Sequence, residues 1–252
     1  MEDIKENVEI NTVRSVERSL DILLCFVHST ELSLTEITNL VSLHKSTVYR
    51  MLQTLELKGF LIKNNSNEKY RLGFKIWELS ANLSGMNDPA TLFLPEMERL
   101  RNLLDETISL YIRDGYERIR IQSIESNQSL RRVAPIGERL PLALGASSKV
   151  LITYEEKSIQ EDILKQLASN YQIDKNSFEK VIEDVKILGY ATSFEERAIG
   201  AVAIACPIFN RQKSIIAALS VSGPVNRLTY EKLEEIAPVL TASCSKLQGI
   251  IN

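Results

Sequence analysis

The stretch from residue 33 to residue 72 constrains this chain most, because its pattern predicts two short helices, a tight turn between them and a small hairpin. Ser33 is followed three positions later by Glu36, a pair that caps the start of a helix reciprocally. Apolar side chains then recur at helical spacing and predict one buried stripe, formed by Leu34, Ile37, Leu40 and Val41.

The second helix of this stretch begins near Lys45 and carries two different faces. Its apolar face repeats at helical spacing and consists of Val48, Met51, Leu52 and Leu55. The opposite face, roughly 200° away at about 100° per residue, offers polar groups from Ser46, Tyr49, Arg50 and Gln53. The pattern therefore predicts a helix that packs on one side and presents hydroxyl, amide and guanidinium groups on the other.

The segment after this helix predicts a basic hairpin. Gly59 is the left-handed stop expected after a helix, and alternating side chains flank a turn at residues 64–67. Between Leu43 and Lys75, seven Lys or Arg residues oppose two Glu, a local charge of +5 in a chain whose formal net charge is -3. A helix, a turn, a polar helix and a basic hairpin describe a winged helix-turn-helix, whose second helix enters the major groove of DNA.

The predicted DNA contacts fall into two groups. The residues expected at the major groove are Lys45, Ser46, Thr47, Tyr49, Arg50 and Gln53. Among these, Arg50 and Gln53 have the bidentate geometry that reads guanine and adenine, respectively. The residues expected at phosphates are Lys63 and Lys69 in the hairpin and Arg14 and Arg18 in the first helix. For the two arginines, a solvated helix face is an equal alternative.

Length, composition and histidine usage exclude several classes of protein. A chain of 252 residues fits one or two domains, it has no apolar run near 18 residues, and its acidic start, MEDIKENVEI, is not a secretory signal. Three widely spaced cysteines favour reduced thiols in a cytoplasmic protein over a disulfide frame or a zinc site. Both histidines, His28 and His44, precede residue 81, so the larger part of the chain lacks Ser-His, Cys-His and His-metal chemistry. We therefore expect neither an enzyme nor a cofactor.

The remaining pattern predicts two domains joined by a helix. A first helix is expected over residues 12–28, from the spacing of Val16, Leu20, Leu23, Leu24 and Val27. A helix over residues 74–83 runs into the Gly-, Asn- and Pro-containing break before Pro89. We place a winged helix-turn-helix domain at residues 11–73, a connector helix and linker at 74–88, and a second domain at 89–252.

The second domain alternates helical and strand patterns. Its first helix is predicted from Phe93, Met97, Leu100 and Leu104, and strands follow over residues 108–113, 117–125 and 129–134. In the middle strand, Arg118 and Arg120 alternate with isoleucines, which predicts an antiparallel strand with one wet face. Helices are expected over 158–168 and 177–188, strands over 201–209 and 214–222, and a last helix from Thr229. The fold class is α+β.

Six segments in order resemble the IclR family of transcriptional regulators: SVERSLDILL, HKSTVYRMLQTLELKGFL, YRLGFKIWELS, GERLPLALGASSKVLIT, GYATSFEERAIGAVAIACPIF and ALSVSGP. The resemblance implies a GAF-like second domain, an antiparallel sheet with flanking helices that binds an effector. It also implies a dimer or tetramer on palindromic double-stranded operators. The effector would be a small molecule, often an organic or aromatic acid, that changes DNA affinity.

The resemblance also places the effector site. Carried over by motif, its residues are Ala146, Ser147, Ser148, Ser193, Glu196, Ala203, Ser220 and Ser222. The Gly-Ala-Ser-Ser turn entering a helix would leave backbone N–H groups free for an anion. Ala143, Ser148 and Ala203 depart from the usual family residues and make one wall more apolar. For Glu196 the alternatives are holding the loop or a subunit interface.

Two other functions stay open at this point. The second domain could be ligand-blind and serve only dimerisation, or it could be an enzyme that the first domain targets to DNA. The only obvious reactive groups for an enzyme are Glu195, Glu196 and Cys206. The resemblance leaves both a repressor and an activator open.

Overall fold

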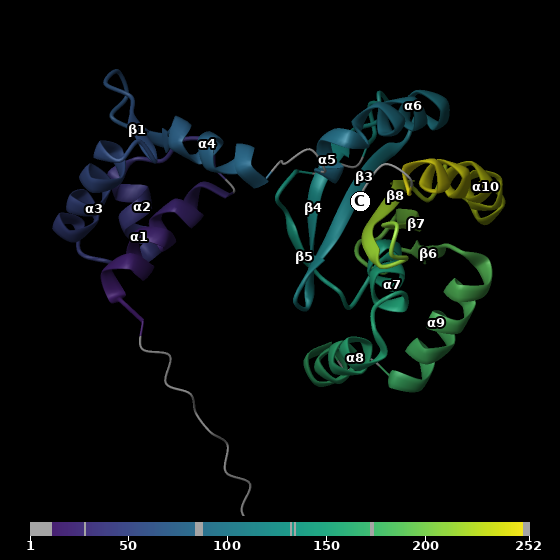
Figure 1. The fold of residues 1–252 in the computed structure, drawn as a ribbon. Coiled ribbons are helices and arrows are strands. Elements are labelled where there is room, and N and C mark those ends of the chain that lie inside the picture. Colours follow the sequence, from purple (N-terminus) through teal and green to yellow (C-terminus); the bar gives the residue numbers. More distant parts are fainter. Residues whose placement is uncertain are drawn as a thin grey trace, which may run out of the picture. The chain divides into compact units, whose positions relative to one another are not determined.

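The computed structural model describes residues 12–27, 29–83, 88–131, 133, 135–171 and 174–248 (Figure 1). His28 and most of the predicted interdomain break lie outside these residues. The chain forms two compact units, one ending at Gly85 and one starting at Met86, and each is described by itself.

The N-terminal unit is a helix-turn-helix with a wing. Its elements are α1 (Arg14–Leu24), a 3-10 turn η1 (Cys25–Val27), α2 (Leu34–Val41), α3 (Lys45–Leu57), β1 (Leu61–Lys63), β2 (Tyr70–Leu72) and α4 (Phe74–Leu83). The predicted capping box is present, since the Glu36 N–H donates to Ser33 Oγ at 3.3 Å and the Ser33 N–H donates to Glu36 Oε2 at 2.7 Å. Ser42 makes the tight turn between α2 and α3 with a φ of 51°.

The core of this unit differs in part from the predicted one. In α3 the predicted apolar face is confirmed, with Val48, Leu52 and Leu55 buried and Met51 partly buried. In α1, by contrast, Ile22 is buried, together with Phe26 of η1, whereas most of the residues that predicted the helix are exposed: Val16, Leu20, Leu24 and Val27. Leu40 of α2 is exposed as well. Helical spacing alone did not predict which of these residues are buried. Helix α1 carries two apolar stripes, and the rest of the unit covers only one of them.

The C-terminal unit is built on one antiparallel sheet. Its helices are α5 (Pro89–Leu92), α6 (Leu94–Leu104), α7 (Ala146–Thr153), α8 (Lys157–Tyr171), α9 (Lys175–Leu188) and α10 (Tyr230–Leu247). Its strands are β3 (Thr107–Asp114), β4 (Glu117–Ile124), β5 (Arg139–Pro141), β6 (Ala191–Phe194), β7 (Ala201–Phe209) and β8 (Ile215–Pro224). They lie in the order β5-β4-β3-β8-β7-β6. This arrangement confirms the predicted α+β class.

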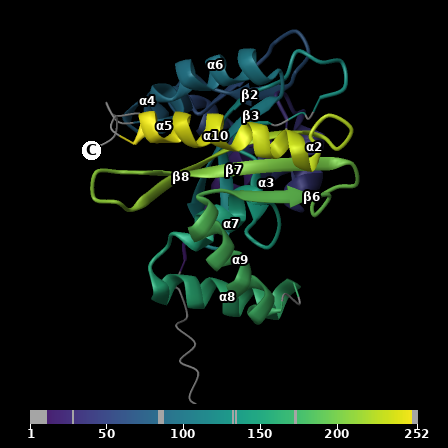
Figure 2. The ribbon, with the colours of Figure 1, turned by 90° about the vertical axis from the view of Figure 1, so that its right-hand side faces the viewer.

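The two faces of the sheet pack against different helices (Figure 2). One core joins α6 and α10 to large side chains of the central strands, such as Ile108, Leu219 and Val221. The other joins α7, α8 and α9 to small ones, such as Ala205 and Ala218. Because side chains alternate along a strand, β7 and β8 carry mostly large side chains on one face and mostly small ones on the other. The small face is the one that leaves room beneath α7.

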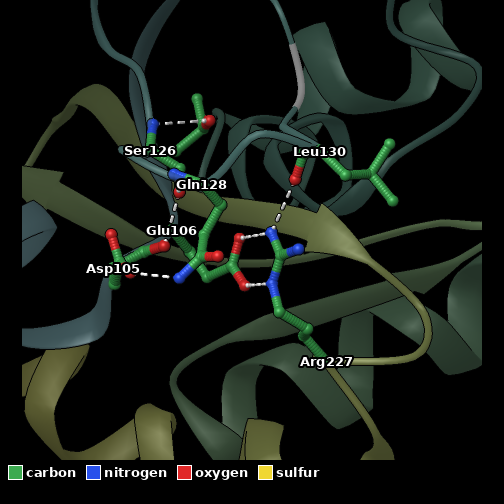
Figure 3. Close-up of polar contacts among 7 residues, drawn as sticks. Asp105, Glu106, Ser126, Gln128, Leu130 and Arg227 are labelled. Carbon is green, nitrogen blue, oxygen red and sulfur yellow. Dashed lines mark hydrogen bonds and ion pairs between the residues drawn. The ribbon is translucent and has the colours of Figure 1, made fainter.

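The strand predicted over residues 129–134 is wrong, since none of the described residues of that segment lies in a strand. Ser126, Gln128 and Leu130 lie beside the start of β3 (Figure 3). Ser126 Oγ donates to the Asp105 carbonyl at 2.6 Å, and Arg227 Nη2 donates to the Leu130 carbonyl at 3.0 Å. Instead, the short strands β5 and β6 form the two edges of the sheet, and the sequence analysis predicted neither.

An ion pair between the buried Glu106 and the half-buried Arg227 anchors this region (Figure 3). Arg227 binds Glu106 through both carboxylate oxygens, at 2.6 and 2.9 Å. The carboxylate lies so close to Gly223 that a Cβ there would meet Glu106 Oε2 at 2.3 Å. The glycine of the Ser-Gly-Pro segment is therefore required by a close approach.

Candidate functional site

The exposed face of α3 carries the side chains predicted for the major groove. Lys45, Ser46, Tyr49, Arg50 and Gln53 are exposed and Thr47 is half-buried. Gln53 Nε2 donates to Tyr49 Oη at 3.3 Å, so these two side chains lie together on the surface. His44 caps the helix, since its Nδ1 lies 2.8 Å from Ser46 Oγ and accepts from the Ser46 N–H at 3.4 Å.

The residues predicted at phosphates are placed less uniformly. Arg14 is exposed on α1 and Arg18 is half-buried. In the wing, Lys63 pairs with Glu68 across the turn, and the hydrogen bond that its Nζ donates to the Glu68 carboxylate raises the pKa of the lysine. Lys69 follows directly and is half-buried. Part of the predicted charge of the wing is therefore balanced within the wing itself.

The C-terminal unit holds a cavity where α7 begins above the small face of the sheet. Its volume is about 40 Å³. The residues that line it are Tyr111, Arg118, Gly145, Ala146, Ser147, Ser193, Arg197, Ala201, Val202, Ala203, Ser220 and Ser222. Register brings the strand residues together, because Ala203 is paired with Ser222 on one side and Ser193 on the other. Short side chains at these paired positions create the space.

Six of the eight residues predicted for the effector line this cavity: Ala146, Ser147, Ser193, Ala203, Ser220 and Ser222. Ser148 does not, because it is fully buried in α7 and donates its hydroxyl to the Leu144 carbonyl at 3.1 Å. Glu196 does not either. Its carboxylate accepts from the Gly145 N–H at 2.9 Å and pairs with Lys149, so it holds the start of α7.

The start of α7 is suited to a negatively charged group. Ala146 and Ser147 are the first two residues of the helix, where backbone N–H groups have no acceptor within the helix. Gly145 precedes them with a φ of 101°, a conformation that side chains rarely allow. A Cβ there would also lie 3.0 Å from Arg118 Nη2. Glycine is therefore needed at this position both for the turn and for the approach of the arginine.

The sequence analysis missed three polar residues of the cavity, namely Tyr111, Arg118 and Arg197. The predicted wet face of β4 is wrong, because Arg118 is 1% and Arg120 0% exposed. The alternation along the strand was read correctly, but the arginines occupy the inner face. The segment over residues 135–145 covers them and supplies the acceptors that buried guanidinium groups need.

The hydrogen bonds of the two arginines show how this burial is possible. Arg118 Nη1 donates to the Pro141 and Leu144 carbonyls at 3.0 and 2.8 Å. Arg120 donates to Tyr111 Oη at 3.0 and 2.8 Å and pairs with Glu138. Both guanidinium groups also lie over the Tyr111 ring, at 5.4 and 5.1 Å from its centre. Alternation with isoleucine could not reveal these partners, which come from other elements.

Within the described ranges, no group of three or more His, Cys, Asp or Glu side chains could hold a metal ion. Among those same residues, no helix is both long enough and apolar enough to cross a membrane.

Comparison with known proteins covers both units. The family model for the IclR helix-turn-helix domain matches residues 15–64, and the model for the bacterial transcriptional regulator IclR C-terminal domain matches residues 85–248. The transcriptional regulator KdgR of Escherichia coli is 31% identical over 244 residues, which cover 95% of this chain and 93% of KdgR. XynR of the same species is 33% identical, over 88% of this chain and 90% of XynR.

Solved structures share the fold. An IclR homologue from Microbacterium hydrocarbonoxydans, crystallised with 4-hydroxybenzoate, superposes with a TM-score of 0.81 at 22% identity, covering 93% of this chain and 97% of the homologue.

Proposed function

The chain belongs to the IclR family of bacterial transcriptional regulators, and from this premise we propose that α3 reads its operator while the cavity beneath α7 binds the effector. The observation that carries the proposal is the outward polar face of α3, which holds Tyr49, Arg50 and Gln53 clear of the core. Lys45, Ser46 and Thr47 at the start of the helix accompany them, and Lys63, Lys69, Arg14 and Arg18 hold phosphates. The DNA target places its action in the cytoplasm.

The effector proposed here is a small organic acid. Its support is the set of donors around the cavity: the first N–H groups of α7, the serine hydroxyls and two arginines. The ligand named for the Microbacterium homologue, 4-hydroxybenzoate, is an acid as well. The protein can adopt one arrangement that binds the operator and another that does not. An acid changes operator affinity only if its binding free energy differs between these two arrangements.

We also propose a homo-oligomer, either a dimer or a tetramer, on a palindromic operator. Its support is the apolar surface of the N-terminal unit: Val13, Val16, Leu20, Leu24 and Val27 on α1 and η1 or beside them, and Phe74, Trp77 and Leu79 on α4. Exposed apolar patches of this extent mark interaction surfaces. A two-fold dimer would place its recognition helices on half-sites about 34–36 Å apart or a multiple of that.

The test of the DNA site begins with operator sequences selected from a random pool by the wild-type protein. Titration of the best sequence should show that Arg50→Ala loses about 1–3 kcal/mol of binding free energy, roughly 5- to 150-fold, and becomes less selective at one base. Arg211→Ala, an exposed arginine of the C-terminal unit, serves as the matched control and should bind like the wild type. Equal affinity and selectivity of Arg50→Ala and wild type would remove α3 from the interface.

A ligand-blind regulator is the competing function for the C-terminal unit. Calorimetry of the whole protein with a panel of small acids separates the two. Heat of binding together with a change in operator affinity supports the proposal, whereas no heat and no thermal shift with any acid favours a purely structural unit.

A further inference from the structure

The charge around the cavity is one-sided. Arg118 and Arg197 both line it, and among its described lining residues none carries a carboxylate. The nearest carboxylate in sequence, that of Glu196, is directed to the Gly145 N–H and to Lys149. Two arginines therefore line the same small space as the positive end of α7, where the Glu196 carboxylate already accepts from the Gly145 N–H.

The side chains of both arginines approach the backbone at Gly145. A Cβ on Gly145 would lie 3.0 Å from Arg118 Nη2 and 3.3 Å from Arg197 Cδ. The two arginines come from opposite walls, Arg118 from β4 and Arg197 from the segment between β6 and β7. A ligand that contacts both arginines would therefore connect β4 with the segment that follows β6.

Arg118 is held in place before any ligand arrives. Its Nη1 is fixed by the carbonyls of Pro141 and Leu144, and its guanidinium lies over the Tyr111 ring. A planar guanidinium fork matches the two oxygens of a carboxylate, and a side chain that is already ordered loses little further entropy on binding. Arg118 is therefore suited to set specificity for charge.

The volume of the cavity limits the ligand. At about 40 Å³ the cavity is only a few times the roughly 10–15 Å³ needed to hold one water, which favours a compact ligand. A short two- or three-carbon chain with its carboxylates is such a ligand. A benzene ring together with a carboxylate needs more room.

We propose that the cavity takes a compact aliphatic dicarboxylate of the size of oxalate or malonate, with one carboxylate on Arg118 and the other between Arg197 and the first N–H groups of α7. This inference rests on the proposed function and narrows it from small acids to short dianions. The serine hydroxyls of Ser193, Ser220 and Ser222 complete the donor set.

The experiment is calorimetry of the full-length protein with malonate, propionate, malonamide, inorganic phosphate and benzoate. Malonate should bind at least ten times more tightly than each of the other four. Arg118→Gln and Arg197→Gln should each lower malonate affinity at least tenfold while changing malonamide affinity less than twofold. Arg139→Gln, an exposed arginine of the neighbouring strand β5, is the matched control and should change neither.

Two controls separate a loss of packing from a loss of charge recognition. The uncharged ligand malonamide reports on packing alone, and Arg197→Lys, which keeps the positive charge, should recover part of the malonate affinity. If Arg118→Gln does not fold, the half-buried Arg197 variants decide the matter. The inference is overturned if propionate, phosphate or benzoate binds wild type as tightly as malonate, if the glutamine variants keep their preference for malonate, or if no probe binds.

The two proposals fail in different ways. If malonate binds with the expected selectivity but leaves operator affinity unchanged, the dicarboxylate site stands and ligand-responsive regulation falls. If operator affinity responds to an aromatic or monocarboxylic acid instead, regulation stands and the dicarboxylate site falls.

Discussion

The two units present their polar side chains in opposite ways. In the N-terminal unit the polar side chains of α3 point outward from a helix whose other face is packed. In the C-terminal unit the cavity side chains point inward, and Arg118 and Arg120 are as buried as the leucines of the core. A surface charge acts on a partner that arrives from outside, whereas a buried charge must first be satisfied by the protein's own groups. Removal of Arg50 should therefore affect DNA binding with little change in stability, whereas removal of Arg120 should lower the stability of the C-terminal unit.

The strongest test of this contrast is Arg120→Ala. Removal of this guanidinium leaves the Glu138 carboxylate and Tyr111 Oη without their donor inside the C-terminal unit. Breaking a fully buried pair costs about 3–5 kcal/mol of unfolding free energy, and because the Glu138 side chain is 29% exposed we expect the lower end of that range, about 3 kcal/mol. Urea denaturation followed by circular dichroism measures it, and hydrogen exchange locates the loss in the sheet.

Two exposed arginines are the controls for that loss. Arg139→Ala breaks pairs with Asp114 and Glu117 at the surface and should cost no more than about 1 kcal/mol. Arg50→Ala should change unfolding free energy by no more than about 0.5 kcal/mol. A similar loss for Arg120→Ala and Arg139→Ala would contradict the contrast between buried and exposed charge.

The same contrast exists within the sheet, between its packed face and its cavity face. Ala217→Leu inserts a large side chain into the core under α6 and α10, and overpacking of this kind costs about 1–3 kcal/mol. Ala203→Leu inserts the same side chain toward the cavity, which should cost less and abolish acid binding. Thermal denaturation and calorimetry measure both effects. Equal destabilisation by the two variants would mean that no usable space lies beneath α7.

Sequence patterns correctly predicted the features that lie on the outside of a regular element. The capping box, α3 and its polar face follow from residues close in sequence, so local spacing was sufficient to predict them. The six cavity residues found in advance came from family resemblance, since a serine pair on a strand does not by itself indicate a ligand. The sequence did not predict the other three polar residues of the cavity, Tyr111, Arg118 and Arg197. Local patterns do not show which segments of the chain come to lie next to one another.

The failures have one physical origin. Alternation shows that Arg118 and Arg120 share a face but does not say which face is wet, and only the loop over residues 135–145 decides it. Likewise, the apolar residues of α1 fit a helix, but tertiary packing selects Ile22 and leaves Leu20 exposed. Both the burial of the two arginines and the burial of Ile22 depend on contacts with residues far away in the sequence. Local patterns do not encode such contacts.

A smaller effect is expected at the start of α2, where the capping box stabilises the helix that supports α3. Ser33→Ala should cost about 1 kcal/mol of unfolding free energy, within the 0.5–2 kcal/mol typical of such caps. The hydrogen bond from the Ser33 N–H lowers the pKa of the Glu36 carboxyl. The folded state then binds fewer protons than the unfolded one, so this contribution is complete above the unfolded pKa and is lost as pH falls through the folded pKa.

Denaturation of wild type and Glu36→Gln over a pH series measures that contribution. The difference between them should be largest at neutral pH and shrink as the pH is lowered into the acidic range. Glu17→Gln, at the start of the uncapped helix α1, is the matched exposed control. A difference that is constant with pH would show that the carboxylate contributes through its shape alone.

The smallest effect is expected in the wing. There the exposed charge of Lys63 is already paired within the protein, as are the buried charges of the C-terminal unit. Glu68 holds Lys63 in the free protein, and that pairing must be given up for a phosphate contact. Glu68→Gln should therefore raise operator affinity a few-fold and make the slope of log affinity against log salt steeper by up to about one unit, since one more cation displaces counterions. Lys63→Ala in the Glu68→Gln background should return the slope to its original value, whereas Lys213→Ala in the C-terminal unit should leave it unchanged. An unchanged slope in Glu68→Gln would place Lys63 away from the DNA and leave Lys69 as the phosphate contact of the wing.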